Sequence, residues 1–305
     1  MKKYLKSMLL MAVAIVSATM FVACGDDDDE PKKEDTTYLV AGKVVSKFNE
    51  QPIADVTVTF TLQSDKSVTY TTKTAADGTY KFDKVKLGKY DFLLKKEKYS
   101  SASAEVSIKD NIDDFISHIS KDPAAYLPAT SELVDLGLSV KWASCNLGAD
   151  APEKTGTFYA WGELASKEDY SKETCLYYEK EMADISGNPD YDAAAKLSNG
   201  KMRMPTQKEM TELLEKCEGV DCKYKEVSGL LFIGSTDNSI FLPYAGAMIN
   251  KEHRKSQTES TNINYWTSSP IANDNHNAYA LTASLSLKVN NCMRYAGFQI
   301  RPVAK

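Results

Sequence analysis

Residues 273–277 place four oxygen-bearing side chains and one imidazole in five consecutive positions. Amide and carboxylate oxygens can ligate calcium or accept hydrogen bonds from sugar hydroxyls. Residues of these types are also the ordinary content of a polar turn. The candidate ligand-binding residues of this segment, with a plain turn as the alternative, are Asn273, Asp274, Asn275, His276 and Asn277.

Aromatic residues and single charged residues form a second group of candidates. Aromatic faces suit sugar rings, and a carboxylate can accept hydrogen bonds from sugar hydroxyls. Aromatic residues at strand ends are nevertheless more often part of a core. The candidates of this group, with a core position as the alternative, are Trp161, Glu163, Tyr265, Trp266 and Arg294.

The residue types that most enzymes require are sparse. Only His118, His253 and His276 are available as histidine general bases. No Ser-His-Asp arrangement, Gly-rich phosphate loop or spaced pair of carboxylates stands out. We therefore expect a protein that is not an enzyme, with no catalytic residue, no cofactor and no bound metal.

The first 24 residues predict export. Lys2, Lys3 and Lys6 precede an apolar run of about 15 residues, which is too short to span a bilayer and has the layout of a secretory signal. The run ends in Phe21-Val22-Ala23-Cys24, which resembles the lipobox of bacterial lipoproteins. The resemblance implies a signal peptide over residues 1–23 and an acylated Cys24 that anchors the protein to a membrane.

Five adjacent acids, Asp26 to Glu30, follow Cys24. They repel one another and bury nothing, so residues 24–36 are predicted to form a solvated tether. Cysteine followed by acids also resembles the lipoprotein export signal of Bacteroidota, which implies an outer-membrane lipoprotein exposed at the cell surface. Calcium is not favoured here because consecutive acids lack the spaced ligands of calcium loops.

The net charge limits the classes of partner that the chain is expected to bind. Loss of residues 1–23 removes three lysines and no acid, so 34 basic residues face 42 acidic ones and the net charge becomes −8. With no Lys/Arg cluster, neither nucleic acid nor an anionic membrane surface is an expected partner.

Five cysteines remain besides Cys24, so at least one thiol stays free. The loose spacing of Cys217 and Cys222, with no histidine nearby, argues against zinc.

Residues 37–120 are predicted to form an all-β sandwich. Short runs with period-2 alternation are separated by turn signals such as Asp77-Gly78. The segments Gly42-Lys43-Val44, Asp77–Phe82 and Leu87–Tyr90 resemble the carboxypeptidase regulatory-like domain, a transthyretin-like or immunoglobulin-like sandwich. That family is mostly structural or accessory. We therefore expect a stalk without chemistry, followed by a linker over residues 121–131.

Residues 132–305 contain an ordered set of motifs. They read DLGLSVKWA, YAWGE, MPTQKE, IFLPYAG, YWTSS and GFQIRPV in chain order. The set resembles the Fibrobacter succinogenes major paralogous domain and implies a mixed α/β, C-type lectin-like fold. Within it, Thr206 and Glu209 form a capping box ahead of an apolar face, which predicts a helix from about Gln207 to Cys217. The expected fold class is mainly β and multidomain.

A cell-surface protein that binds a glycan or protein ligand through residues 132–305 is the leading interpretation. Calcium-dependent lectins carry Glu-Pro-Asn or Gln-Pro-Asp motifs that this chain lacks. A structural component of an outer-membrane complex is one alternative, and a ligand face diversified over residues 262–295 is another. An enzyme of the formylglycine-generating type is least favoured because Cys292 has no second cysteine at matching spacing.

Overall fold

The computed structural model describes residues 36–255, 263–283 and 286–305, and the chain divides into two units, residues 1–36 and 37–305. The predicted signal peptide, Cys24 and nearly all of the acidic tether lie outside the described residues. Within the described ranges, no helix combines the length and apolar character needed to cross a membrane.

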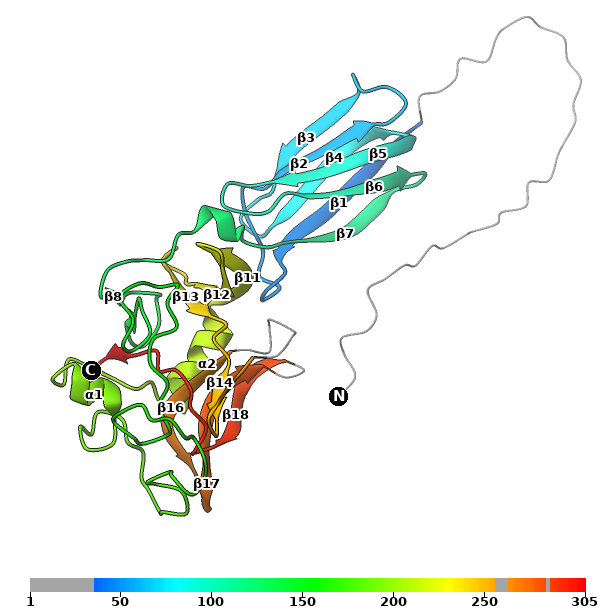
Figure 1. The fold of residues 1–305 in the computed structure, drawn as a ribbon. Coiled ribbons are helices and arrows are strands. Elements are labelled where there is room, and N and C mark those ends of the chain that lie inside the picture. The colour runs from blue at the N-terminus through cyan, green and yellow to red at the C-terminus, as the bar shows by residue number, and fades with distance from the viewer. Residues whose placement is uncertain (1–35, 256–262, 284–285) are drawn as a thin grey trace, which may run out of the picture. The chain divides into compact units, whose positions relative to one another are not determined.

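Residues 37–119 form a sandwich of two β-sheets that lie face to face (Figure 1). One sheet has the strand order β3-β2-β5-β6 and the other β4-β1-β7, with every pair antiparallel except β1 and β7. The strands are β1 (Thr37–Ser46), β2 (Thr57–Leu62), β3 (Thr69–Lys73), β4 (Thr79–Lys86), β5 (Gly88–Lys95), β6 (Ala102–Ile108) and β7 (Ile112–Ile119).

Alternation of side chains builds the core of this sandwich, as the period-2 pattern predicts. Successive residues of a strand face opposite sides, so Tyr80 and Phe82 of β4 both point inward and are buried. Phe60 of the opposing sheet meets Phe82 edge to face at 5.6 Å. Gly78 adopts a φ of 76° in the turn before β4, and a Cβ there would lie 2.5 Å from the Val44 carbonyl oxygen. The β-sandwich prediction is confirmed.

The described residues of the range 121–305 contain a 3₁₀ turn, two helices and four small sheets joined by long loops. The sheets have the orders β10-β19-β9-β8, β11-β12-β13, β14-β15 and β16-β17-β18. The first elements are η1 (Pro123–Ala125), β8 (Leu133–Val134), β9 (Trp142–Ala143), α1 (Ala193–Leu197), β10 (Met202–Arg203), α2 (Gln207–Lys216), β11 (Glu218–Tyr224) and β12 (Val227–Ile233). The others are β13 (Ser239–Pro243), β14 (Ala247–Ile249), β15 (Glu252–Arg254), β16 (Asn264–Ile271), β17 (Asp274–Ala283), β18 (Leu287–Met293) and β19 (Val303–Ala304).

Helix α2 begins at the predicted capping box. The Thr206 hydroxyl accepts from the Glu209 N–H at 3.3 Å, and the Glu209 carboxylate accepts from the Thr206 N–H at 2.8 Å. Met210 and Leu213 are fully buried and pack with residues of β12, β13, β16 and β17 in one core. The predicted helix is therefore confirmed, with Cys217 as its C-cap.

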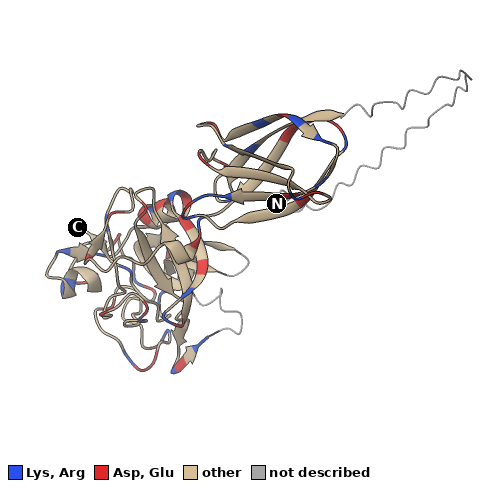
Figure 2. Cartoon of the chain, turned by 90° about the horizontal axis from the view of Figure 1, so that it is seen from above, with Lys and Arg blue, Asp and Glu red and all other residues tan. Residues whose placement is uncertain are grey.

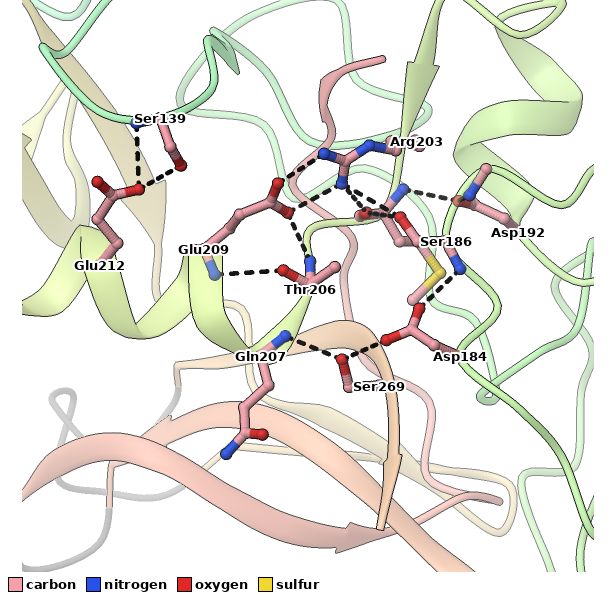
Figure 3. A network of polar contacts seen from close by, with 12 residues as sticks. Ser139, Asp184, Ser186, Asp192, Arg203, Thr206, Gln207, Glu209, Glu212 and Ser269 are labelled. Atoms are coloured by element: carbon pink, nitrogen blue, oxygen red, sulfur yellow. Dashed lines mark hydrogen bonds and ion pairs between the residues drawn. The ribbon is translucent and has the colours of Figure 1, made fainter. Parts of the chain in front are cut away.

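Polar contacts join the start of α2 to distant parts of the chain (Figure 3). Arg203 donates to both oxygens of Glu209, at 2.5 and 2.9 Å. The Ser269 hydroxyl accepts from the Gln207 N–H at 3.0 Å and donates to Asp184 at 2.6 Å. The MPTQKE and YWTSS motifs, far apart in the chain, thus meet at one helix end and supply acceptors for the N–H groups of Gln207 and Glu209.

The ion pair of Arg203 and Glu209 predicts a pH-dependent contribution to stability. Burial alone would raise the pKa of Glu209, but hydrogen bonds from Arg203 and the Thr206 N–H outweigh it and hold the pKa below its ordinary value of 4.5. The pair therefore stabilises the fold above about pH 4.5, and this contribution is lost as the pH falls through the lowered pKa. We expect Glu209→Gln to lower the free energy of unfolding by about 1 to 2 kcal/mol at pH 7. The difference in the free energy of unfolding between the variant and the wild type should shrink toward pH 3.

Urea unfolding of both proteins at pH 7 and pH 3 measures this difference. Glu215→Gln is the matched control because Glu215 lies on the same helix, is exposed and has no ion pair among the described residues. An equal difference at both pH values would contradict the role assigned to the Glu209 carboxylate.

Candidate functional site

Both candidate tryptophans lie in the core and face no solvent. Trp161 and Trp266 are both fully buried. The Trp161 indole N–H donates to the Thr267 carbonyl at 2.9 Å, and that of Trp266 donates to the Tyr159 carbonyl at 2.8 Å. Each ring therefore has a partner within the protein, which fits the core alternative considered for these residues and offers no ligand-facing surface.

Tyr265 and Glu163 are also enclosed. The Tyr265 hydroxyl donates to the Pro243 carbonyl at 3.1 Å, and burial raises its pKa to about 12. One Glu163 oxygen accepts from the Lys167 ammonium at 2.8 Å and from the Leu176 N–H at 2.9 Å. Both side chains hold the chain in place and do not reach a surface that a ligand could touch.

Arg294 lies beneath the loop surface and has a structural role. Its side chain is 1% exposed, and its guanidinium lies 4.5 Å from the centre of the Trp161 ring. Burial lowers the pKa of Arg294 from its ordinary value. The guanidinium donates to four backbone carbonyls, those of Tyr177 (3.2 Å), Lys180 (2.7 Å), Asp274 (3.3 Å) and Asn277 (3.1 Å). It thereby joins the 177–180 loop to the start of β17.

The candidate residues 273–277 form the turn between β16 and β17 and the start of β17. Asn273 adopts a φ of 60°, which asparagine tolerates well. Asp274 accepts from the N–H groups of His276 and Asn277 and from the Asn277 side-chain amide, at 2.8 to 3.1 Å. The Asn277 side-chain hydrogen bond, followed by the one from the His276 N–H, lowers the pKa of Asp274. The Asp274 oxygens are thus committed to the turn, whereas Asn273, Asn275 and His276 are exposed.

An aromatic strip, which the sequence patterns do not reveal, lies beside this turn. We define it as four partly buried side chains that pack on Ala160, Tyr170 and Cys175, namely Phe158, Tyr178, Met248 and Tyr295. The ring centres of Tyr178 and Tyr295 are 5.7 Å apart, with 61° between the ring planes. The ring centre of His276 lies 4.9 Å from that of Tyr178. At Phe158, His253 makes a similar edge-to-face contact at 5.1 Å.

The β14–β15 hairpin is held in place by a close backbone approach. Met248 and Gly297 exchange two backbone hydrogen bonds, at 2.8 and 2.9 Å. A Cβ at position 297 would lie 2.6 Å from the Tyr170 ring and 2.7 Å from the Met248 Cβ. Only glycine at position 297 therefore leaves room for Met248 to pack with Tyr170 in this cluster.

The side chains that could ligate a metal or act as thiols form the last group of candidates. Within the described ranges of the chain, no group of three or more His, Cys, Asp or Glu side chains could hold a metal ion. All five cysteines of these ranges are free thiols, and Cys175 and Cys217 are buried. Burial raises the pKa of Cys217 and of Cys292 to about 12, which makes both thiols poor nucleophiles.

Comparison with known proteins supports the β-sandwich. Residues 36–118 match the family described as BOS complex subunit NOMO1-like, second beta sandwich domain. A search of curated proteins finds no match.

Similar solved structures are distant. They include 3-chlorocatechol 1,2-dioxygenase from Rhodococcus opacus (11% identity, 30% of this chain, 62% of that chain, TM-score 0.25). A second is the group B streptococcus pilus 2b backbone protein (14% identity, 29% of this chain, 42% of that chain, TM-score 0.25). A third is the major pilin subunit of Bacillus cereus (13% identity, 28% of this chain, 30% of that chain, TM-score 0.23). This chain covers less than two thirds of each of these proteins, and similarities of this size carry no functional argument.

The contacts of Arg294 predict that this side chain supports the loop surface. We expect Arg294→Met to lower the free energy of unfolding by about 3 kcal/mol, because it leaves several buried carbonyls without a donor. Amide hydrogen exchange should accelerate in residues 175–180 and 274–277. Arg254→Met on β15 is the matched control because that arginine is exposed. Equal stability and exchange in the two variants would contradict this role.

Proposed function

We propose that this protein is a non-enzymatic lipoprotein of the outer membrane, exposed at the cell surface, that binds a glycan or protein ligand through residues 132–305. The observation that carries the proposal is the aromatic strip. Aromatic rings that stay partly exposed on loops, above a well-packed core, are typical of binding surfaces. Tyr178 and Tyr295 combine an apolar ring with a hydroxyl and are suited to either class of ligand.

The motifs of residues 132–305 support a C-type lectin-like domain. Several of their residues form the scaffold beneath the loops, with Trp161, Trp266 and Arg301 fully enclosed. A short helix, small antiparallel sheets and long loops are what the resemblance to the Fibrobacter succinogenes major paralogous domain implies. In such a protein the sandwich of residues 37–120 would act as a stalk, and the loops would supply ligand specificity.

Lipid anchoring rests on Cys24 and can be tested directly. We expect metabolic labelling of the producing bacterium with an acyl-chain analogue to label the wild-type protein, and Cys24→Ala to abolish the label and the membrane association. Cys145→Ala should keep both, because Cys145 lies outside the signal. An unlabelled wild-type protein, or a labelled Cys24→Ala variant, would overturn the anchor. Antibody labelling of intact cells then tests surface exposure.

If ligands bind through the aromatic strip, the same substitutions should weaken the binding of every ligand found. Screens of the mature chain, residues 24–305, against glycan arrays and extracellular proteins should yield a ligand. Replacement of both Tyr178 and Tyr295 by alanine should weaken its binding by about tenfold or more, since central aromatic anchors dominate interface energies. Tyr38→Ala in the sandwich is the control. Binding that survives the double replacement would place the ligand elsewhere, and blank screens would favour the structural-component alternative.

A further inference from the structure

The loop that supplies Tyr178 is strongly acidic. Residues 163–190 contain eight acids and three lysines, for a formal net charge of −5. One of the acids, Glu163, is already paired with Lys167. Figure 2 shows Lys and Arg interspersed with Asp and Glu along the described residues. This loop therefore contributes negative charge on the Tyr178 side of the aromatic strip.

Two carboxylates lie beside the strip. Glu179 is the residue next to Tyr178, its side chain is 70% exposed, and one of its oxygens is 3.5 Å from His276 Nε2. The Asp274 side chain is 3.7 Å from the other ring nitrogen of His276 and is only 28% exposed. Glu179 is thus the charge that an incoming partner can reach most easily, and no Lys or Arg among the described residues pairs with it.

Several other tyrosine rings of this chain make cation–π contacts with lysines of the same chain. Lys180 Nζ is 5.4 Å from the centre of the Tyr177 ring, and Lys167 Nζ is 5.7 Å from that of Tyr170. Tyr99, Tyr126 and Tyr224 have lysines at similar distances. Among the described residues, no such cation lies over Tyr178 or Tyr295, and both rings are only partly buried. A cation from a partner would therefore not have to displace a lysine or arginine of these residues.

We propose that the partner of the aromatic strip is a basic protein segment, with a Lys or Arg side chain that contacts the Tyr178 and Tyr295 rings and pairs with Glu179. This inference rests on the proposed binding function and names the class of its ligand. Two aromatic rings with a neighbouring carboxylate provide cation–π attraction and an ion pair together. A neutral glycan would gain no charge attraction from the acidic loop, and an anionic glycan would be repelled by it.

The test uses the mature chain and three defined probes. These are a ten-residue peptide of alternating Gly with Lys and Arg, the same peptide with acetyl-lysine and citrulline in place of the charged residues, and a neutral β-linked hexasaccharide. Calorimetry or NMR titration should detect binding of the basic peptide alone. Binding should weaken with rising salt, as expected for contacts between exposed charges.

Variants locate the binding site. Glu179→Gln and Tyr178→Leu should each weaken peptide binding about fivefold, since the first removes the charge and the second the π face at similar bulk. Asp113→Asn on β7 removes one exposed charge from the sandwich and should leave binding unchanged. Thermal unfolding of each variant checks that the fold is intact.

Each other outcome overturns the inference in an identifiable way. Hexasaccharide binding that depends on Tyr178, without peptide binding, would refute the basic partner and leave the proposed function standing. Peptide binding that is insensitive to Glu179→Gln and Tyr178→Leu would show only general attraction to an acidic protein. Absence of binding by all three probes would overturn the inference, and the glycan and protein screens would then decide the proposed function separately.

Discussion

A buried guanidinium has five N–H donors, and the protein around it must supply acceptors for them. Arg294 donates to four such acceptors, the backbone carbonyls of the 177–180 loop and the start of β17, and its Cζ lies over the Trp161 ring. The Glu179 N–H donates to the Asn275 carbonyl at 3.0 Å, and the arginine adds four hydrogen bonds to carbonyls of the same two segments. The positions of Tyr178 and His276 on the surface follow from the carbonyls that Arg294 holds underneath.

Arg301 repeats this arrangement seven residues later in the chain. Its guanidinium donates to the carbonyls of Ala143, Ser144 and Phe241 and to the Asn146 side chain, at 2.7 to 3.2 Å, and it is fully buried. The closing segment thus contains two buried cations that bind backbone carbonyls from distant segments. In a domain of small sheets and long loops, such contacts supply the long-range order that a large sheet would otherwise provide.

The sandwich and helix α2 could be predicted because their signals are local. Period-2 alternation decides which face of a strand is buried, and the pair of Thr206 and Glu209 marks a helix start within four residues. The roles of Trp161, Trp266 and Arg294 could not be predicted, since residue type alone does not distinguish a ring in a core from a ring at a surface. Tyr178 is not predicted, and Tyr295 enters only as the end of the 262–295 stretch, because nothing in their neighbouring residues indicates that the fold brings the two rings together.

Aromatic NOE spectroscopy of the mature chain tests most directly the surface that Arg294 supports. With Tyr178 and Tyr295 ring centres 5.7 Å apart and Tyr178 and His276 ring centres 4.9 Å apart, both ring pairs should give clear cross-peaks at neutral pH. Cross-peaks between the Trp161 ring and the Arg294 side chain should accompany them. A folded protein that lacks all three sets would contradict the aromatic strip and the buried arginine beneath it.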